Sequence, residues 1–537
     1  MSSKLVKGTA ILTIGLFLSK ALGLLYLIPL YAIVGKESIG LYQYAYIPYN
    51  IALAIAISGA PLGVSRFVAK YNALGDYATG RKLMKSGMYV MTLTGVLAFL
   101  SLFFLAEPIA HMVIKDKEQV FTVLQITTVI RWVSFSLLVV PLMSIVRGFL
   151  QGYNKMEPTA VSQLIEQIVR IIAVLVGAYV VVNFMNESPE KAINFAVFAS
   201  FIGALAGLGV LYWYWRKYKP ELDYLLENSV STEETPSFMK MYKELFGYLL
   251  PFVLVGVINP LYQFVDMITF NDAMKSIGMS TVSDTYLGML NLLTHKFVMI
   301  PVMIATGFSM ALIPVLTTYF TKNDQKGITR SLDQTYQIMM YLTIPLVIGL
   351  MVLADEFYQL LYEKDAMGAE ILTNYAPVAI LFGLFTVSAA ILQGIDRHKW
   401  IIFNSLTGLL IKLAINIPLV KLFETNGAIL ATAIGYAVAV GLNIAVISRV
   451  LQYKSKVVLR RLVLIGILNF IMFVVVYFVL KGLTAFSAVD GKMQALLYIL
   501  ICAFVGAVIY GYLSLKTGLA QKLFGERLTR FTDKLGF

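Results

Sequence analysis

The sequence contains very few of the residues that build most metal and catalytic sites. Among 537 residues there is one cysteine, Cys502, and there are three histidines, His111, His295 and His398. A single cysteine excludes an internal disulfide and a cysteine-based metal site. The histidines are scattered and lack the spacing of a zinc motif. We therefore expect no metal site, no cofactor and no catalytic residues.

Charged residues are also scarce. They make up 14% of the chain, whereas 59% of the residues are hydrophobic. A soluble domain carries about 25% charged residues, and a soluble chain this apolar would expose large hydrophobic patches. The composition therefore predicts a protein whose solvent is lipid. The first apolar segment, 9–35, is too long for the core of a signal peptide and no small-residue cleavage site follows it, so we expect it to remain as a span.

Fourteen segments are apolar enough to cross a membrane, which takes about 20 mostly apolar residues. Their predicted limits are 9–35, 44–69, 83–106, 119–146, 157–183, 192–215, 244–270, 286–319, 334–354, 370–394, 400–423, 426–448, 462–480 and 493–515. The pattern predicts an all-α polytopic membrane protein with 14 transmembrane helices.

Positive charge is distributed unevenly between the loops. Most of the 43 Lys and Arg residues lie in loops on the side of the two termini, for example in 70–85, 216–243 and 449–461. Loops rich in Lys and Arg stay in the cytoplasm, so we expect both termini there. The net charge of +13 follows from this topology. Because no nucleic-acid-binding motif accompanies it, we expect no nucleic-acid partner.

The longest polar segment, 216–243, divides the spans into two halves. We interpret residues 1–215 as a first lobe of six spans and 216–243 as a cytoplasmic linker. Residues 244–450 would form a second lobe of six spans. The remaining residues, 451–537, would provide two further spans and a cytoplasmic tail.

Short motifs recur at equivalent places in the two halves. Leu150-Gln151-Gly152 follows span four, and Leu392-Gln393-Gly394 follows span ten. At the same offset, Arg170 in span five aligns with Lys412 in span eleven. A second set of matches joins spans two and eight, in which Gly59, Tyr71, Asp76 and Lys82 align with Gly307, Tyr319, Asp324 and Arg330. Because both halves begin in the cytoplasm, we expect two lobes related by a pseudo-twofold axis along the membrane normal. Transporters of this kind hold the substrate between the lobes and alternate access.

Ionisable residues inside the spans are candidate functional groups, because charge in the hydrocarbon costs about 2.5–3.5 kcal/mol on insertion scales. The cations inside predicted spans are Lys20, Arg66, Arg131, Arg170, Lys296 and Lys412, and the acids are Glu166 and Asp266. This excess of positive charge favours an anionic substrate.

Four of these residues also have a purely structural interpretation. Glu166 and Arg170 lie four residues apart on one helical face and would neutralise each other. Lys412 would pair in the same way with Asp266. All four stay candidates for the cavity or for coupling between the lobes.

The other four cations differ in depth. Arg66 lies near the cytoplasmic end of its span, where it would extend its charge to the headgroups, and Arg131 would pack against a polar neighbour. Lys20 lies about eleven residues into span one, too deep for its charge to reach the headgroups. Lys296 is placed similarly in span eight. Depth therefore favours substrate binding for Lys20 and Lys296.

Several segments resemble one family of exporters. They are Ser19–Gly23, Val64–Asn72, Arg147–Tyr153, Pro158–Gln163, His295–Pro301 and Leu392–Asp396. They resemble the Gram-positive MurJ/YtgP branch of the multidrug/oligosaccharidyl-lipid/polysaccharide exporter superfamily, along nearly the whole chain. The resemblance implies a two-lobed flippase for lipid II, the undecaprenyl-diphosphate-linked muropeptide. It also implies the bacterial cell membrane and a role in peptidoglycan biosynthesis and cell shape.

The resemblance also implies binding residues. Such proteins have a cationic central cavity in which basic residues on spans one, two and eight contact the diphosphate. Lys20 and Lys296 fall on the basic positions of spans one and eight, and Arg66 is the nearest basic residue of span two. The second span-one arginine of Gram-negative members is replaced here by Tyr26.

Some relatives bind sodium in the second lobe. The corresponding residues of this sequence are Asp266, Lys412, Asn416 and Thr432. A lysine ammonium would take the place of the ion, so we expect no sodium site and coupling to membrane potential or protons instead.

Alternative functions remain at this point. Export of another undecaprenyl-linked polysaccharide and a sporulation-specific role are alternatives within the same superfamily. A drug or cation antiporter is less favoured, because it needs carboxylates in its cavity. A membrane-embedded glycosyl or acyl transferase would need a carboxylate or histidine cluster at a span end. The acids of 355–370 are the best such cluster, and we interpret them as a solvated loop. We expect a monomer that is not an enzyme and contacts membrane lipids.

Overall fold

The protein is described by a computed structural model. It covers residues 15, 18–19, 21–23, 25–57, 59–230, 237–453, 456–487 and 491–524. No strand occurs in these ranges, and 13 of their helices are long and apolar enough to cross a membrane. The prediction of an all-α polytopic membrane protein is confirmed.

The chain forms two compact units, residues 1–288 and 289–537. The helices of the first unit are α2 (Leu27–Ile39), α3 (Leu41–Ile57), α4 (Ala60–Ala73), α5 (Tyr77–Val113), α6 (Val123–Ser134), η1 (Phe135–Leu138), α7 (Val140–Gly152), α8 (Glu157–Tyr179), η2 (Val180–Phe184), α9 (Pro189–Glu227), α10 (Phe238–Ser276) and α11 (Ser280–Gly288).

The second unit begins with a π-helix. Its helices are η3 (Met289–Thr294), α12 (His295–Thr321), α13 (Gln325–Val352), α14 (Ala354–Leu361), α15 (Ala366–Tyr375), α16 (Val378–Gly394), α17 (His398–Leu451), α18 (Lys456–Phe486), α19 (Lys492–Lys516) and α20 (Leu519–Phe524).

Twelve of the 13 candidate helices each overlap one predicted span. The exception is α17, which has 54 residues and is kinked at Glu424, where φ is 52° and ψ is −131°. The two arms of α17 lie side by side, because the Asn404 Nδ2 donates to the Asn443 Oδ1 at 2.9 Å across the kink, and each arm is long enough to cross about 30 Å of hydrocarbon. α17 therefore contains the two predicted spans 400–423 and 426–448. The total of 14 spans stays a prediction.

Side chains on the outer faces of the helices are those expected of a protein in lipid. Phe470 and Phe478 on α18 and Phe504 on α19 are each more than 60% exposed. In water, such apolar surface would drive aggregation, whereas in a bilayer it contacts acyl chains of the same polarity.

The sequence repeat corresponds to repeated local structure. Asp76 caps α5 by accepting a hydrogen bond from the Thr79 N–H at 2.9 Å, and Asp324 caps α13 by accepting one from the Gly327 N–H at 2.9 Å. The turn after each Leu-Gln-Gly motif is also the same, because Asn154 and Asp396 both adopt positive φ, 58° and 56°. Residues aligned in sequence therefore perform the same structural task.

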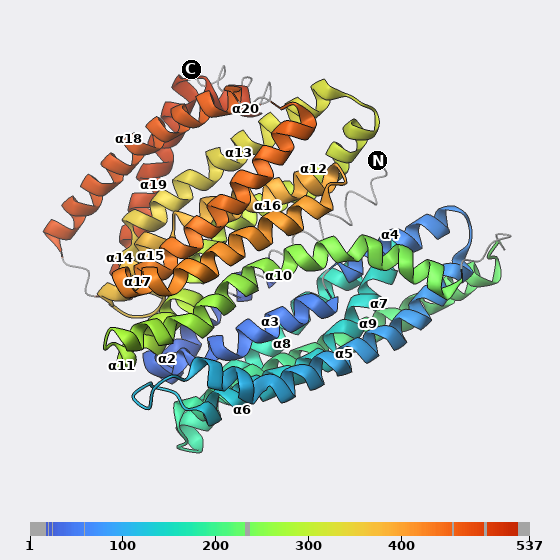
Figure 1. Cartoon of the computed structure of the whole chain (residues 1–537), viewed down its shortest axis with the longest axis horizontal. Helices are drawn as coiled ribbons and strands as arrows, with labels where there is room; N and C mark the ends of the chain where they lie inside the picture. The colour runs from blue at the N-terminus through green and yellow to red at the C-terminus, as the bar shows by residue number, and fades with distance from the viewer. Residues whose placement is uncertain are drawn as a thin grey trace. The chain divides into compact units, whose positions relative to one another are not determined.

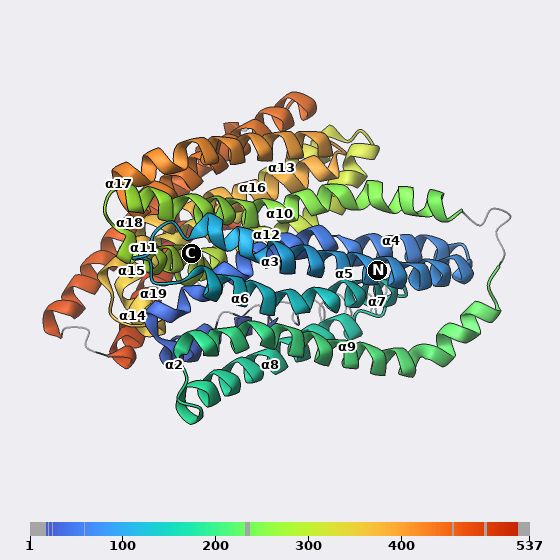
Figure 2. The ribbon, with the colours of Figure 1, turned by 60° about the horizontal axis from the view of Figure 1, so that its bottom comes forward.

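In the first unit, small residues let helices approach closely. α8 lies beside α9 (Figure 2), and a Cβ on Gly203 of α9 would lie 2.7 Å from the Glu166 carbonyl oxygen. α4 packs on α7, where a Cβ on Gly152 would lie 2.6 Å from the Val68 Cβ. α10 runs along α3 (Figure 1) and also contacts α4 and α5.

In the second unit, α12 packs between α13 and α16, and α16 contacts α17 (Figure 1). α13 also packs on α18, which pairs with α19. The first unit includes α10 and α11, although the sequence assigned them to the second lobe. The lobe boundaries at 215 and 244 stay a prediction.

Candidate functional site

The three predicted substrate-binding residues differ in what the structure says of them. Lys20 lies outside the described residues. Arg66 is exposed at the middle of α4, and Lys296 is half-buried in the first turn of α12. Lys296 directly follows His295, whose Nδ1 lies 2.9 Å from the Tyr375 hydroxyl. Packing of His295 against α15 thus fixes the backbone that carries Lys296.

Glu166 forms its close ion pair with Arg147, while Arg170 interacts with it only through longer-range attraction. The Arg147 Nη2 lies 2.8 Å from the Glu166 Oε2, and its Nε donates to the Ser162 Oγ at 3.0 Å. Arg147 lies just outside the predicted span 119–146, but its side chain is only 8% exposed. The helical spacing of Glu166 and Arg170 was correct, but α7 packs beside α8 and supplies the closer cation.

We expect Arg147→Ala to lower the stability of the folded protein. Removing one partner of a buried ion pair costs about 3–5 kcal/mol, and the lower end applies here because Glu166 is 26% exposed. Thermal unfolding in detergent measures the change. Arg131→Ala is the matched control and should have a much smaller effect, so equal unfolding temperatures for the two variants would contradict this assignment.

Arg170 lies next to a cluster of tyrosines in the first unit. Its guanidinium carbon is 5.6 Å from the centre of the Tyr26 ring, a cation–π distance. The Tyr26 hydroxyl is 2.8 Å from the Tyr42 hydroxyl, and Tyr42 stacks on Tyr46 at 4.4 Å. The Arg170 Nε is buried without a hydrogen-bond partner in the described structure. The resemblance expects an arginine of span one at the position of Tyr26. The cation next to Tyr26 is instead Arg170, which belongs to span five.

Arg131 has local partners, as its structural interpretation requires. Its side chain is 38% exposed and its Nη2 lies 3.7 Å from the Glu107 Oε2. Its Nε donates to the Phe103 carbonyl at 3.4 Å, and its guanidinium carbon lies 5.1 Å from the centre of the Phe103 ring. These contacts join α6 to α5 and make Arg131 a poor candidate for the cavity.

Lys412 is fully buried in the second unit and donates a hydrogen bond from Nζ to the Thr432 Oγ1 at 2.8 Å. Asn416 lies one helical turn further along α17 and is also fully buried. The ammonium group therefore occupies the neighbourhood of two of the residues that correspond to sodium ligands in relatives. Asp266, the fourth residue of that pattern, is buried on α10 in the first unit.

Glu356 was interpreted as part of a solvated loop, but it is buried on α14, so that interpretation is wrong for this residue. A further buried acid, Asp284 on α11, was missed. It lies just before the predicted limit of span eight at residue 286, so the span count did not include it. Its side chain has no exposed surface. The sequence does contain a signal for Asp284: a carboxylate directly before an apolar span. If such a group is buried, it needs hydrogen-bond partners.

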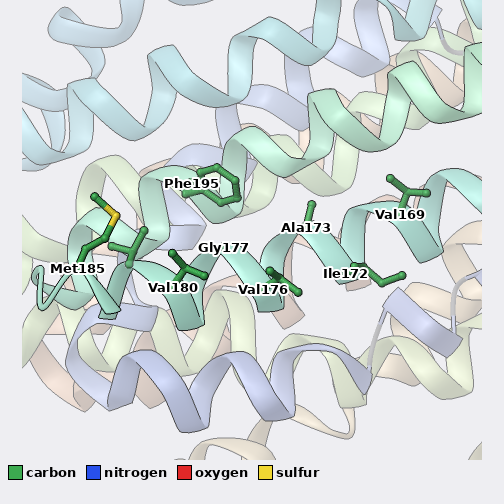
Figure 3. Close-up of a pocket in the computed structure, with 9 residues that line it drawn as sticks. Val169, Ile172, Ala173, Val176, Gly177, Val180, Met185 and Phe195 are labelled. Atoms are coloured by element: carbon green, nitrogen blue, oxygen red, sulfur yellow. The ribbon is translucent and has the colours of Figure 1, made fainter. Parts of the chain in front are cut away.

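One groove, of about 470 Å³, lies between α8 and α9. In Figure 3, Val169, Ile172 and Val176 of α8 line it together with Phe195 of α9. Gly177 leaves room for the Phe195 ring, because a Cβ there would lie 2.0 Å from it. All of its lining residues are apolar, so this groove suits hydrocarbon and cannot hold a diphosphate.

In the described ranges, thirteen apolar helices with charged residues of both signs buried among them define a multi-pass membrane protein of the exporter class. The chain belongs to the family described as "Polysaccharide biosynthesis protein", which it matches over residues 5–320. Residues 251–417 also match the family "MatE".

Curated relatives agree with this assignment. The chain is 44% identical over 540 residues to "Lipid II flippase MurJ" of Bacillus subtilis (strain 168), covering 99% of each chain. It is 27% identical to "Stage V sporulation protein B" of the same organism, covering 84% of this chain and 85% of that protein.

Solved structures show the same fold. A structure described as "Lipid II flippase MurJ, inward closed conformation" superposes with a TM-score of 0.67 at 17% identity, covering 95% of this chain and 99% of that one. An inward-facing multidrug resistance MATE family transporter superposes with a TM-score of 0.64 at 13% identity, covering 80% and 94%.

Proposed function

We propose that this protein is a flippase that moves lipid II from the inner to the outer leaflet of the cell membrane. The observation that carries this proposal is the 44% identity, over 99% of both chains, with the Bacillus subtilis protein named for that activity. A match of this length includes every predicted span, so it supports a shared function and not the fold alone.

The excess of cations over acids inside the predicted spans supports an anionic substrate. Lys20, Arg66 and Lys296 would bind the diphosphate in place of water, and Arg170 is a fourth candidate because its Nε has no partner in the described structure. Charge-assisted hydrogen bonds are stronger than neutral ones, and a low dielectric strengthens them further. The charge of the substrate also lowers the cost of burying these cations. The polyprenyl tail would stay in lipid.

Transport would proceed by alternating access between the lobes 1–215 and 244–450, joined by the linker 216–243. The equivalent caps of α5 and α13 support this internal repeat. Both termini would lie in the cytoplasm, and the protein would act as a monomer without enzymatic activity, nucleic acid or cofactor.

The test is depletion of the protein in cells followed by an assay of lipid II at the outer face of the membrane. We expect lipid II to accumulate in the inner leaflet and to become inaccessible to an external probe. Purified protein in vesicles should make internal lipid II accessible from outside. Unchanged accessibility in both systems would refute the proposal.

A second candidate is export of another undecaprenyl-linked saccharide. The 27% identity with a sporulation protein over 84% of this chain favours testing it. The same vesicles can be loaded with an undecaprenyl-diphosphate saccharide that carries no peptide. Faster translocation of that lipid than of lipid II would favour the second candidate.

We expect translocation to be independent of sodium. The Lys412 ammonium, 2.8 Å from the Thr432 Oγ1, would repel a second cation at that place. The measurement compares translocation in vesicles with sodium and with potassium or choline as the only added cation. Equal rates are expected, and a strict requirement for sodium would show that Lys412 does not replace the ion.

A further inference from the structure

Asp284 accepts hydrogen bonds from three other segments of the first unit. The hydroxyl of Tyr44 on α3 donates to its Oδ1, as does the Nδ2 of Asn271 on α10 at 3.0 Å. From the loop after α5, the Gln119 Nε2 lies 3.4 Å from Oδ1 and the Phe121 N–H lies 3.4 Å from Oδ2. All four donors are neutral, so the carboxylate is held by hydrogen bonds alone.

The turn between α10 and α11 is tied to the same loop. The Lys275 Nζ donates to the Lys115 carbonyl at 2.7 Å and lies 3.8 Å from the Asp116 Oδ2. The Ser280 Oγ donates to the Asp116 Oδ2 at 3.2 Å. These contacts extend the Asp284 network to the surface of the protein.

The last turn of α11 is in direct contact with the junction of α2 and α3. A Cβ on Gly288 would lie 2.9 Å from the Gly40 Cα, so the two backbones touch. In the orientation that satisfies its surroundings, the Gln43 amide donates to the Leu287 carbonyl at 3.0 Å and accepts from the Gly288 N–H at 2.9 Å. We call the contacts of Asp284, Asp116 and Gln43 with their partners the Asp284 clamp.

The Asp284 clamp joins parts of the chain that the repeat assigns to different lobes. Asn271 and Asp284 lie between predicted spans seven and eight, in the second lobe, whereas Tyr44 and Gln119 belong to the first. By the predicted topology, all of them lie at the outer end of the spans. Directly after the clamp, Met289–Thr294 is π-helical and leads to Lys296. π-helical turns inside helices occur frequently at functional sites.

We propose that the Asp284 clamp is the closed outer gate of the transporter, and that it must separate for the substrate head to reach the outer leaflet. This inference rests on the proposed alternating access. Asp284 is then a positioning residue, because it holds the outer part of span eight, and with it the start of the segment that carries Lys296. One carboxylate suits the task because it collects donors from α3 and from the loop after α5, two segments of the first lobe that would separate from it together.

A reversible cross-link tests whether the clamp must open. Asp116→Cys with Ser280→Cys, in a Cys502→Ser background, replaces two side chains whose oxygens are 3.2 Å apart and leaves Asp284 intact. Oxidation of the double variant should stop lipid II translocation in vesicles, and reduction should restore it. Each single-cysteine variant is a control and should not respond to the oxidant. An oxidised, fully cross-linked protein that translocates at the rate of the reduced protein would overturn the proposal.

A second variant tests the role of Asp284 without any substrate. Asp284→Asn places an amide N–H₂ among four donors, so the outer end should open more often. Ser283→Cys on α11, in the Cys502→Ser background, is a buried reporter. An external membrane-impermeant maleimide should label it faster with Asp284→Asn than with Asp284. Asp272→Asn, an exposed acid next to Asn271, is the matched control and should leave the rate unchanged. Equal labelling of all three would contradict the gate.

The two arms separate the possible failures. If the parent protein does not translocate lipid II, the proposed function fails, whereas the labelling result still reports on the gate. If Asp284→Asn does not fold, the cross-link alone decides.

Discussion

Lys296→Ala is expected to abolish lipid II translocation while the protein stays folded, and Lys20→Ala is expected to do the same. A charge-assisted hydrogen bond contributes about 1.5–3 kcal/mol, and each 1.4 kcal/mol is tenfold in affinity. Each substitution should therefore weaken binding of the diphosphate roughly 10- to 100-fold. Lys296 is half-buried, so its removal takes away charge more than packing. The measurements are the translocation rate in vesicles and the unfolding temperature in detergent.

Two control variants test whether the effect depends on the charge of Lys296 and on its place in the protein. Lys296→Arg keeps the charge and should retain part of the activity. Lys492→Ala removes an exposed lysine at the start of α19 and should change neither measurement. If the alanine variants of Lys20 and Lys296 both translocate at the normal rate, these lysines do not bind the substrate.

Arg170→Met should lower translocation strongly without lowering the stability of the protein. The buried Nε of Arg170 has no hydrogen-bond partner in the described structure, and the cation–π contact with Tyr26 offsets only part of the cost of burying the guanidinium. Replacing such a group by an apolar one of similar length is often neutral or stabilising. An anionic substrate would supply the missing partner, and its affinity should fall about tenfold or more when the guanidinium is removed.

The comparison of two arginines makes this prediction specific. Arg147→Met should lower the unfolding temperature, because it leaves Glu166 without its ion-pair partner. Arg170→Met should leave that temperature equal or higher and reduce binding of lipid II. A loss of stability for Arg170→Met with normal binding would mean that Arg170 is structural.

The class of protein was predictable from the sequence because hydropathy is a local property. Each apolar segment is long enough to satisfy its own backbone hydrogen bonds in lipid, whatever its neighbours are. Each candidate helix of the described residues therefore overlaps a predicted span, and α17 overlaps two of them. The matching turns at Asp76 and Asp324 were predictable for the same reason, since a cap depends on residues three positions apart.

The partners of the buried charges were not predictable in this way. Helical spacing paired Glu166 with Arg170, but α7 packs close enough to bring Arg147 within 2.8 Å. Spacing along a chain lists the groups on one helical face. It does not say which other helix will cover that face, because this depends on close contacts such as Gly203 against α8.

The sequence by itself therefore determined that this is an all-helical membrane protein with a repeated half and more cations than acids inside its predicted spans. Only the tertiary structure decided that Arg147 neutralises Glu166, that Lys412 bonds to Thr432, and that Arg170 lies against Tyr26. It alone revealed Asp284, whose donors come from α3, α10 and the loop after α5. The physical reason is the same in each case: the cost of burying a charge is local, but the groups that offset it arrive from distant parts of the chain.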